Sequence, residues 1–210
     1  RDKKACMLYS ADFSGIQKFL FTVATKGALP SLRSRSFFLE LLMEHYIDEL
    51  LSACGVSRVN LLYAGGGHCY ILLPNLPQVS LAITAWNTRF NDWLAGQFGI
   101  SLFLADGWTG CSGNELMNIP AENTPYAAMF RRVSAAIARR KLSRYTPNQL
   151  RMLNAEQTDA QGRECLICGR SDHLAGGGRC FWCNLFVELS AKVLDCPIYL
   201  VSSRKTGADF

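Results

Sequence analysis

The stretch LLYAGGGHCYILLPN, residues 61–75, decides the fold that this sequence predicts. Two β-prone runs, 59–63 and 69–73, lie on either side of a turn that is almost free of side chains, 64–68. Three consecutive glycines permit a tight return of the chain, and Pro74 ends the second run because proline cannot donate to a strand ladder. The stretch therefore predicts an antiparallel β-hairpin.

Amphipathic helices are expected on both sides of this hairpin. Upstream, apolar residues recur at helical spacing over 37–51, and Gly55 follows at the position of a helix end. Downstream, the same spacing extends over 79–98. Each helix would bury its apolar face against the sheet that contains the hairpin.

Two further strands complete the pattern. Residues 6–10 and 100–104 are short β-prone runs. Turn formers follow each of them, at 12–15 and at Asp106-Gly107. The order over residues 5–105 is therefore β-α-β-β-α-β, the ferredoxin-like arrangement of an α+β domain, which palm-type cyclases share. Such a fold does not by itself give a function.

Length and composition place the chain among folded globular proteins. It has 210 residues, of which 49% are hydrophobic and 19% charged, and its net charge is +5. That length fits one full domain and a smaller module. No apolar run approaches the roughly 20 residues that a membrane-spanning helix requires.

The N-terminus and the cysteines bear on cellular context. RDKKACMLYSADF, residues 1–13, has neither an initiator Met nor the pattern of a signal peptide, which predicts a fragment of a longer protein. Nine cysteines without a secretory signal favour metal ligands and reduced thiols over disulfides. We therefore expect a cytoplasmic protein.

Four of the cysteines form the most specific motif. Cys165-x-x-Cys168 and Cys180-x-x-Cys183 are typical of two knuckles that bind zinc through four thiolates. A closed shell of four sulfurs leaves no open position for water, so the ion would stabilise a small module rather than catalyse a reaction. A redox pair or chance spacing is the alternative.

Two short segments are candidates for nucleotide binding. The glycines of the hairpin turn permit close approach of a ligand, although tight turn geometry alone also explains them. The segment after the first strand offers a carboxylate, a hydroxyl, an open backbone and an amide, which suit ribose or phosphate; an ordinary turn and helix cap is the alternative. Metal-binding carboxylates, which palm-type cyclases carry on this hairpin, are absent here. The candidate residues are Asp12, Ser14, Gly15, Gln17, Gly65, Gly66 and Gly67.

Basic residues gather in a second helical region between 126 and 154. Residues 131–151 carry seven cations and no acidic residue. Arginine suits bidentate contact with phosphate, so this stretch predicts contact with RNA or a partner; a solvated helix face is the alternative. Arg33 and Arg35 are a weaker form of the same pattern. The candidate contact residues are Arg131, Arg132, Arg139, Arg140, Lys141 and Arg144.

Several motifs taken together resemble one protein family. They are ADFSGIQKFLF at 11–21, KGALPSLRSRSFFLELL at 26–42, the hairpin at 61–75, RYTPNQL at 144–150 and the double knuckle ECLICG…CFWC. In this order they resemble the large subunit of type III-A (Csm) CRISPR effector complexes. The resemblance covers nearly the whole chain.

The resemblance implies a longer parent protein. In that family the large subunit has an HD nuclease domain, a first palm, a zinc-bearing domain, a second palm with a GGDD motif and a helical C-terminal domain. This chain would hold the first palm at residues 1–125 and the zinc domain with its flanking helices at residues 126–210. The parent would convert ATP, with Mg²⁺ or Mn²⁺, into cyclic oligoadenylate when target RNA is bound, and would cut single-stranded DNA in antiviral defence.

The resemblance also implies roles for residues of this chain. The segment 12–17 would line the nucleotide side of the first palm, and the turn 65–67 would be a degenerate counterpart of the catalytic hairpin. Guide RNA, target RNA, neighbouring effector subunits and the second palm would be its partners.

The expected function is therefore the non-catalytic half of a split ATP site, inactive on its own. A zinc-stabilised RNA-binding or assembly scaffold without a nucleotide pocket is the alternative. The missing hairpin carboxylates disfavour a third option, a free-standing diguanylate-type cyclase.

Overall fold

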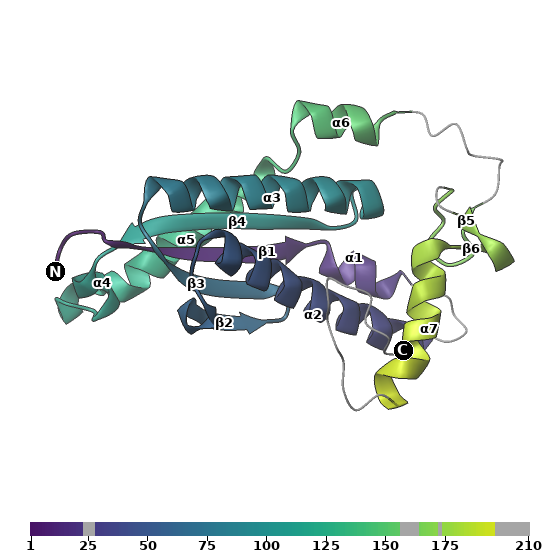
Figure 1. Cartoon of the computed structure of the whole chain (residues 1–210), viewed down its shortest axis with the longest axis horizontal. Helices are drawn as coiled ribbons and strands as arrows, with labels where there is room; N and C mark the ends of the chain where they lie inside the picture. Colours follow the sequence, from purple (N-terminus) through teal and green to yellow (C-terminus); the bar gives the residue numbers. More distant parts are fainter. Residues whose placement is uncertain (23–27, 156–163, 172–173, 196–210) are drawn as a thin grey trace. The chain divides into compact units, whose positions relative to one another are not determined.

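The computed structural model describes residues 1–22, 28–155, 164–171 and 174–195 (Figure 1). Within these residues the chain forms both helices and antiparallel strands, which confirms the predicted α+β class. Of the helices described, none combines the length and the apolar character needed to cross a bilayer.

The chain divides into two compact units. Unit 1 comprises residues 1–21 and 38–158, and unit 2 comprises residues 22–37 and 159–210. The domain boundary at residues 125 and 126 stays a prediction. The two compact units do not coincide with the predicted domains 1–125 and 126–210, because the helix that begins at residue 125 packs on the sheet of unit 1.

Unit 1 is built on a four-stranded antiparallel sheet. Its strands are β1 (Cys6–Ser14), β2 (Leu61–Gly65), β3 (His68–Pro74) and β4 (Phe103–Cys111). Their order across the sheet is β2-β3-β1-β4, with every neighbouring pair antiparallel. This is the ferredoxin-like order, so the predicted element sequence is confirmed.

The helices of unit 1 connect and cover these strands. The short α1 (Ile16–Phe21) and the long α2 (Ala28–Ala53) join β1 to β2, and α3 (Pro77–Phe98) joins β3 to β4. After β4 follow α4 (Gly113–Leu116), α5 (Pro125–Leu142) and α6 (Pro147–Leu153). The unit boundary at residues 37 and 38 falls inside α2.

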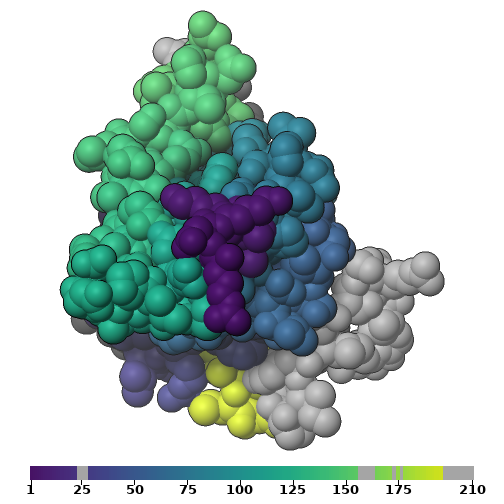
Figure 2. All heavy atoms as spheres, turned by 90° about the vertical axis from the view of Figure 1, so that its left-hand side faces the viewer, coloured from purple at the N-terminus to yellow at the C-terminus, as the bar shows by residue number. Residues whose placement is uncertain are grey.

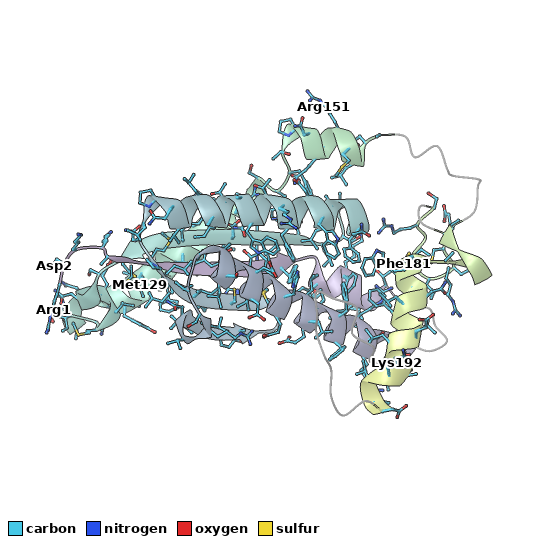
Figure 3. All side chains as sticks on the ribbon, viewed as in Figure 1. Arg1, Asp2, Met129, Arg151, Phe181 and Lys192 are labelled. Carbon is cyan, nitrogen blue, oxygen red and sulfur yellow. The ribbon has the colours of Figure 1, made fainter. Side chains whose placement is uncertain are left out.

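The described residues of unit 2 include the first part of α2, two short strands, a 3-10 turn at Gly176–Gly178 and a helix. The strands and the helix are β5 (Leu174–Ala175), β6 (Arg179–Cys180) and α7 (Phe181–Asp195), and β5 pairs with β6 in antiparallel orientation. Figure 3 labels Phe181 at the start of α7 and Lys192 in its last turn.

The two faces of the main sheet meet different helices. Side chains alternate along β1, so Tyr9 faces α2 and α3, where its hydroxyl contacts Tyr46, while Leu8 faces α5. Leu8 lies in a buried cluster with Met129 and Val133 of α5, and each fully buried apolar side chain contributes roughly 1.5–3 kcal/mol. A third layer therefore covers the face that a two-layer ferredoxin-like domain leaves open.

Two strands are longer than the sequence predicts. The turn formers Asp12 and Ser14 lie inside β1, and Asp106 and Gly107 lie inside β4. The sheet overrides these local preferences, because an unbroken register joins β1 to β4 from Cys6 to Ser14. The predicted turns at both places are therefore wrong.

The hairpin turn is tighter than predicted. Gly65 pairs with His68, which leaves a two-residue turn of Gly66 and Gly67 with φ values of 62° and 79°. Positive φ at both positions is the requirement of a type I′ turn and explains why glycine occupies them. Ala64 and His68, which we expected in the turn, belong to the strands.

The N-terminal residues lie on the surface of unit 1, as the space-filling view shows (Figure 2). Asn114 donates its amide to the Asp2 carboxylate at 2.6 Å, and Asn75 donates to the carbonyl of Lys4 at 2.7 Å. These contacts fix the entry of the chain into β1.

Gly107 provides a test of the packing of α5 on the sheet. A Cβ at Gly107 would lie 2.7 Å from the Cβ of Ala136 and 3.0 Å from the backbone nitrogen of Ile137. We expect Gly107→Ala to lower the free energy of unfolding by about 1–3 kcal/mol, measured by urea denaturation. The control is Gly96→Ala on the exposed side of α3, where nothing lies within 4 Å. It should raise stability by about 0.5–1 kcal/mol, and equal effects of both changes would contradict this account of the packing.

Candidate nucleotide site and metal centre

Asp12 is the centre of a polar cluster on the α5-facing side of the sheet. It is paired across the sheet with His68 of β3, and His68 Nδ1 lies 3.5 Å from Asp12 Oδ1. Lys141 of α5 forms an ion pair with the other oxygen, Oδ2. Ser10, two residues earlier on β1, lies 3.2 Å from His68 Nε2 through its hydroxyl. Both oxygens of Asp12 therefore have partners supplied by the chain.

These partners hold Asp12 in its charged form. Partial burial acts to raise the pKa of the Asp12 carboxyl, but hydrogen bonds from His68 and Lys141 outweigh it, and the pKa lies below its ordinary value. Because the folded pKa is depressed, the contribution to stability is complete above about pH 4, the unfolded value. It is lost as the pH falls through the folded pKa.

Ser14 lies on the same face of β1 as Asp12, next to α1. Its side chain is 8% exposed, and its hydroxyl oxygen is buried without a hydrogen-bond partner among the described residues. A buried unsatisfied hydroxyl costs free energy, so its presence calls for a ligand or another functional reason. Gln17 is exposed on α1.

Packing explains two of the candidate glycines. Gly15 has φ of +93°, and a Cβ there would lie 2.0 Å from the carbonyl oxygen of Ser101. A Cβ on Gly67 would lie 2.5 Å from the Cδ1 of Ile16. Gly66 differs, because it is exposed and nothing lies within 4 Å of its would-be Cβ. Of these three glycines, Gly66 alone leaves room for a ligand at the hairpin tip.

The structure brings the two candidate segments together. The backbone N–H of Phe13 donates to the carbonyl of Gly67 at 2.9 Å, so the hairpin turn lies against the end of β1. The candidates from 12–17 and from 65–67 therefore belong to one region of unit 1. From the sequence we expected Lys141 to contact RNA or a partner and His68 to lie in the hairpin turn, and neither to contact Asp12. The alternation of side chains on β1 and β3 places His68 opposite Asp12 only once the register is known.

The basic residues of α5 are more internally paired than their sequence indicates. Arg132 binds Glu115 at 2.6 Å, Arg140 lies 3.6 Å from Asp106, and Lys141 pairs with Asp12. Each of these three cations faces an acidic residue from outside the stretch 131–151. A count of charges within that stretch therefore does not reveal the pairing. Arg131 and Arg139 are exposed. Arg144 donates to the carbonyl of Lys141 at 3.0 Å.

Unit 2 contains a cluster of four thiols. The Sγ atoms of the four cysteines all lie within 4.8 Å of one another, and those of Cys168 and Cys180 are 3.6 Å apart. A tetrahedral ion with bonds of about 2.3 Å to sulfur requires sulfur atoms just under 4 Å apart, so the set fits one metal ion. The predicted convergence of the two knuckles is confirmed. The four are Cys165, Cys168, Cys180 and Cys183.

Arg35 lies beside this cluster within unit 2. It is 3% exposed, its Nη2 donates to the Sγ of Cys183 at 3.6 Å, and its guanidinium lies 4.7 Å from the ring centre of Phe186. Four thiolates around a divalent ion carry a net negative charge, which a buried guanidinium partly compensates. Arg35, which we expected to contact RNA or a partner, is buried against the cysteine cluster.

Comparison with known proteins identifies relatives of both units. The sequence model described as Csm1 subunit domain B matches residues 5–156. The chain is 38% identical over 205 residues to the CRISPR system single-strand-specific deoxyribonuclease Cas10/Csm1 (subtype III-A) of Mycobacterium tuberculosis, and this alignment covers 91% of the chain and 25% of the relative. The chain therefore spans about a quarter of the length of such curated relatives.

Comparison with solved structures finds proteins of the same kind as the sequence comparison. A Csm1–Csm4 cassette in complex with pppApA superposes with a TM-score of 0.64 at 34% identity, covering 69% of this chain and 20% of that chain. A Csm1–Csm4 subcomplex of the type III-A CRISPR-Csm interference complex gives a TM-score of 0.66 at 28% identity, covering 91% and 22%.

The ion pair at Asp12 predicts a measurable electrostatic coupling. Lys141→Met should raise the pKa of the Asp12 carboxyl, read by NMR titration, because it removes the ammonium group that bonds Asp12 Oδ2. It should also cost about 1 kcal/mol of stability at pH 7, and this cost should shrink as the pH falls through the Asp12 pKa. Lys3→Met, at an exposed lysine, is the control and should leave the Asp12 titration in place. An unchanged Asp12 titration in Lys141→Met would refute the pairing.

The thiol cluster predicts a bound metal ion. Protein purified without chelator should contain about one metal ion per chain by elemental analysis, and Cys183→Ser should remove it because one of four ligands is lost. Cys54→Ser, at a cysteine outside the cluster, should retain the metal. Chelation should expose unit 2 to proteolysis while unit 1 stays resistant. A metal content well below one in the unaltered chain would count against the site.

Proposed function

This chain belongs to the Csm1 family of type III-A CRISPR effector subunits, and we propose that its unit 1 is a palm that holds an adenine nucleotide without carrying out the chemistry. The relative that superposes on it was solved with pppApA, a linear product of adenylate joining. The proposal assigns nucleotide binding to the region of Asp12, Ser14, Gly15, Gln17 and the turn 65–67.

The proposal rests on the observation that both carboxylate oxygens of Asp12 already have partners within the chain. Joining nucleotides requires metal ions held by carboxylates, which lower the pKa of the attacking hydroxyl and neutralise the phosphoryl charge. Here both oxygens of Asp12 are engaged, one with His68 and one with Lys141. The hairpin turn, residues 64–68, supplies no carboxylate. This region is therefore equipped to bind and orient a nucleotide but not to hold catalytic metal ions.

The same residues supply contacts that a nucleotide requires. Lys141 brings a positive charge to the region, the unpartnered hydroxyl of Ser14 can bond a ribose or phosphate oxygen, and Gly66 leaves space at the hairpin tip. The carboxylates and magnesium or manganese ions for catalysis would come from a second palm of the parent protein. ATP would then lie between two palms, and cyclic oligoadenylate would be the product of the assembled protein.

Unit 2 is proposed to be a structural zinc module. Four cysteines as the whole ligand set favour zinc among the common ions, and a closed shell leaves no site for a substrate. Its role would be to stabilise the module around α7. The sequence predicts a palm at residues 1–125 and a zinc domain at residues 126–210, whereas unit 2 comprises residues 22–37 and 159–210.

The solved structures of relatives also bear on the partner subunits of this palm. Two of them were solved as Csm1–Csm4 assemblies. A Csm4-type neighbour is therefore a proposed partner of this chain, together with guide and target RNA. Among the candidate RNA contacts, Arg131 and Arg139 are the best placed because they are exposed, whereas Arg132, Arg140 and Lys141 have acidic partners.

The proposal predicts a division between binding and turnover. This chain alone, incubated with ATP and magnesium or manganese, should give no oligoadenylate by chromatography, since it lacks the carboxylates that bind metal ions. In the complete large subunit within its effector complex, Ser14→Ala should reduce oligoadenylate yield roughly tenfold, because one hydrogen bond to a charged group is lost.

Ser190→Ala is the matched control. Its hydroxyl bonds the carbonyl of Val187 in its own helix, so oligoadenylate yield should be unchanged. Product from the isolated chain would refute the non-catalytic assignment. A Ser14→Ala complex with full yield would instead favour the scaffold function without a nucleotide pocket.

A further inference from the structure

A second concave site lies at the edge of the sheet, away from Asp12. It is a cavity of about 510 Å³ between α3, β4 and α5 within unit 1. Asn87, Asp106, Trp108 and Arg139 are among its lining residues. Asp106 belongs to the α3-facing side of β4, whereas Asp12 belongs to the α5-facing side of β1, so the two sites use different faces of the sheet. A volume of this size is sufficient for a small ligand.

The strand at the base of this cavity has an open edge. β4 pairs with β1 on one side, and the sheet ends there on the other. At Leu104 that outer edge is closed by Asn91, whose amide accepts from the Leu104 N–H at 2.9 Å and donates to the Leu104 carbonyl at 3.0 Å. Since the register is unbroken, alternation points the backbone N–H and C=O of Asp106 and Trp108 to the same outer edge.

The Asn91 contact shows what chemistry fits this edge. A planar amide offers one donor beside one acceptor and makes two hydrogen bonds to a single residue of the strand. Every nucleobase presents a donor beside an acceptor on its edge in the same planar geometry. Trp108, at the cavity, offers this backbone pair again, and no side chain among the described residues covers it as Asn91 covers Leu104. At Asp106 the outward carbonyl is the exposed group, since the N–H bonds the residue's own carboxylate.

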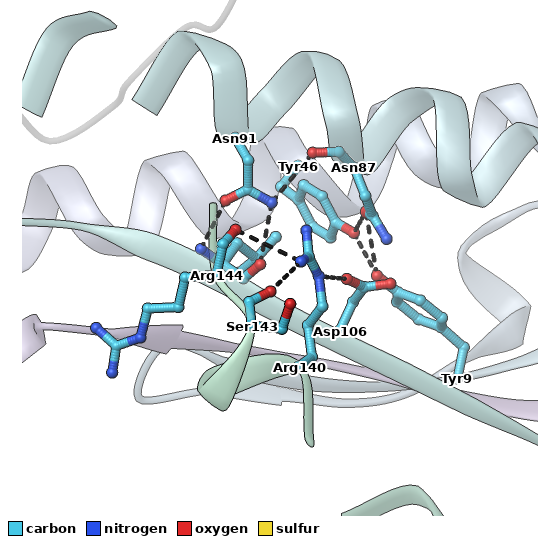
Figure 4. A network of polar contacts seen from close by, with 9 residues as sticks. Tyr9, Tyr46, Asn87, Asn91, Asp106, Arg140, Ser143 and Arg144 are labelled. Atoms are coloured by element: carbon cyan, nitrogen blue, oxygen red, sulfur yellow. Dashed lines mark hydrogen bonds and ion pairs between the residues drawn. The ribbon is translucent and has the colours of Figure 1, made fainter. Parts of the chain in front are cut away.

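Buried polar side chains at the cavity are incompletely satisfied. Asn87 is 4% exposed, and its Oδ1 accepts from Tyr46 and from Tyr9, while its Nδ2 is buried with no hydrogen-bond partner among the described residues. Figure 4 shows Asn87 next to Asp106 and Arg140. Burial raises the pKa of the Asp106 carboxyl, and Arg140 and the Asn87 side chain only partly oppose this shift. A buried amide and an incompletely compensated carboxylate therefore lie side by side at the cavity.

The rim of the cavity adds an aromatic surface and a charge. Trp108 is 36% exposed, which leaves part of its indole available for stacking, and Arg139 is an exposed cation. Base stacking on an aromatic side chain contributes roughly 1–3 kcal/mol, and arginine suits phosphate. An extended peptide fits less well, because Asn91 closes the edge at Leu104 and two helices flank the rest.

We propose that this cavity is a second nucleotide site, which binds the base of a nucleoside monophosphate unit against the edge of β4 and its phosphate at Arg139. The base would meet the backbone of Asp106 and Trp108 together with the Asn87 amide, and would stack on the indole. The chemistry tolerates any base and applies equally to a free nucleotide and to one nucleotide of a strand. It does not depend on the nucleotide-holding role of the Asp12 region.

The test is a titration of the ¹⁵N-labelled chain with AMP, followed by NMR. Saturable shifts should centre on the backbone N–H and the indole N–H of Trp108, and ribose 5-phosphate, which lacks a base, should bind roughly tenfold more weakly. Arg139→Gln and Trp108→Leu should each weaken AMP binding by about tenfold. Arg89→Gln, at an exposed arginine of α3 that does not line the cavity, is the matched control and should leave affinity unchanged.

The arms of this titration separate the alternatives. A single-stranded hexanucleotide that binds far more tightly than AMP at the same residues would identify a strand as the source, and equal affinity would identify a free nucleotide. Shifts confined to Gly66 and its surroundings would locate binding at the Asp12 region alone and overturn the second site. Absence of any saturable binding by AMP and by the hexanucleotide would overturn it as well.

Discussion

The close packing of α5 against the sheet is the constraint on which the rest of unit 1 depends. Ala136 approaches β4 so closely that residue 107 has no room for a side chain. This contact buries Met129, Val133 and Ile137 and fixes the last turn of the helix over the strands. Two consecutive cations then reach different faces of the sheet, Arg140 toward Asp106 and Lys141 toward Asp12. One packing interface thus sets the electrostatics of both candidate sites.

In this arrangement Lys141 neutralises the Asp12 carboxylate, as a divalent metal ion does in palms that catalyse nucleotide joining. A palm that catalyses nucleotide joining leaves its strand carboxylate free for divalent cations. Here an ammonium group and an imidazole lie at the two oxygens, and the pKa of Asp12 stays low without a metal. A fixed monovalent cation attracts phosphate, but it cannot bind and activate a hydroxyl as a divalent ion does. In the proposed function, substrate binding by this palm is therefore separate from catalysis.

Local patterns predicted the elements better than their contacts. The hairpin, both long helices and the convergence of the cysteines followed from periodicity and spacing, because each is determined by residues near one another in sequence. The ends of β1 and β4 were missed, since turn formers such as Asp12 and Gly107 are held in strands by neighbours distant along the chain. The same limit applied to α5, whose cations were read as a free basic face although Glu115, Asp106 and Asp12 neutralise three of them.

The edge of β4 shows that a fold can provide binding groups that no sequence motif indicates. An edge strand exposes backbone donors and acceptors, which proteins usually cover or pair. In this chain Asn91 covers one such position, and the next two lie in a cavity bordered by an indole and an arginine. No motif marks these residues, because the recognising groups are mainly backbone atoms and their placement depends on strand register. Register, rather than residue identity, decides what this edge is able to bind.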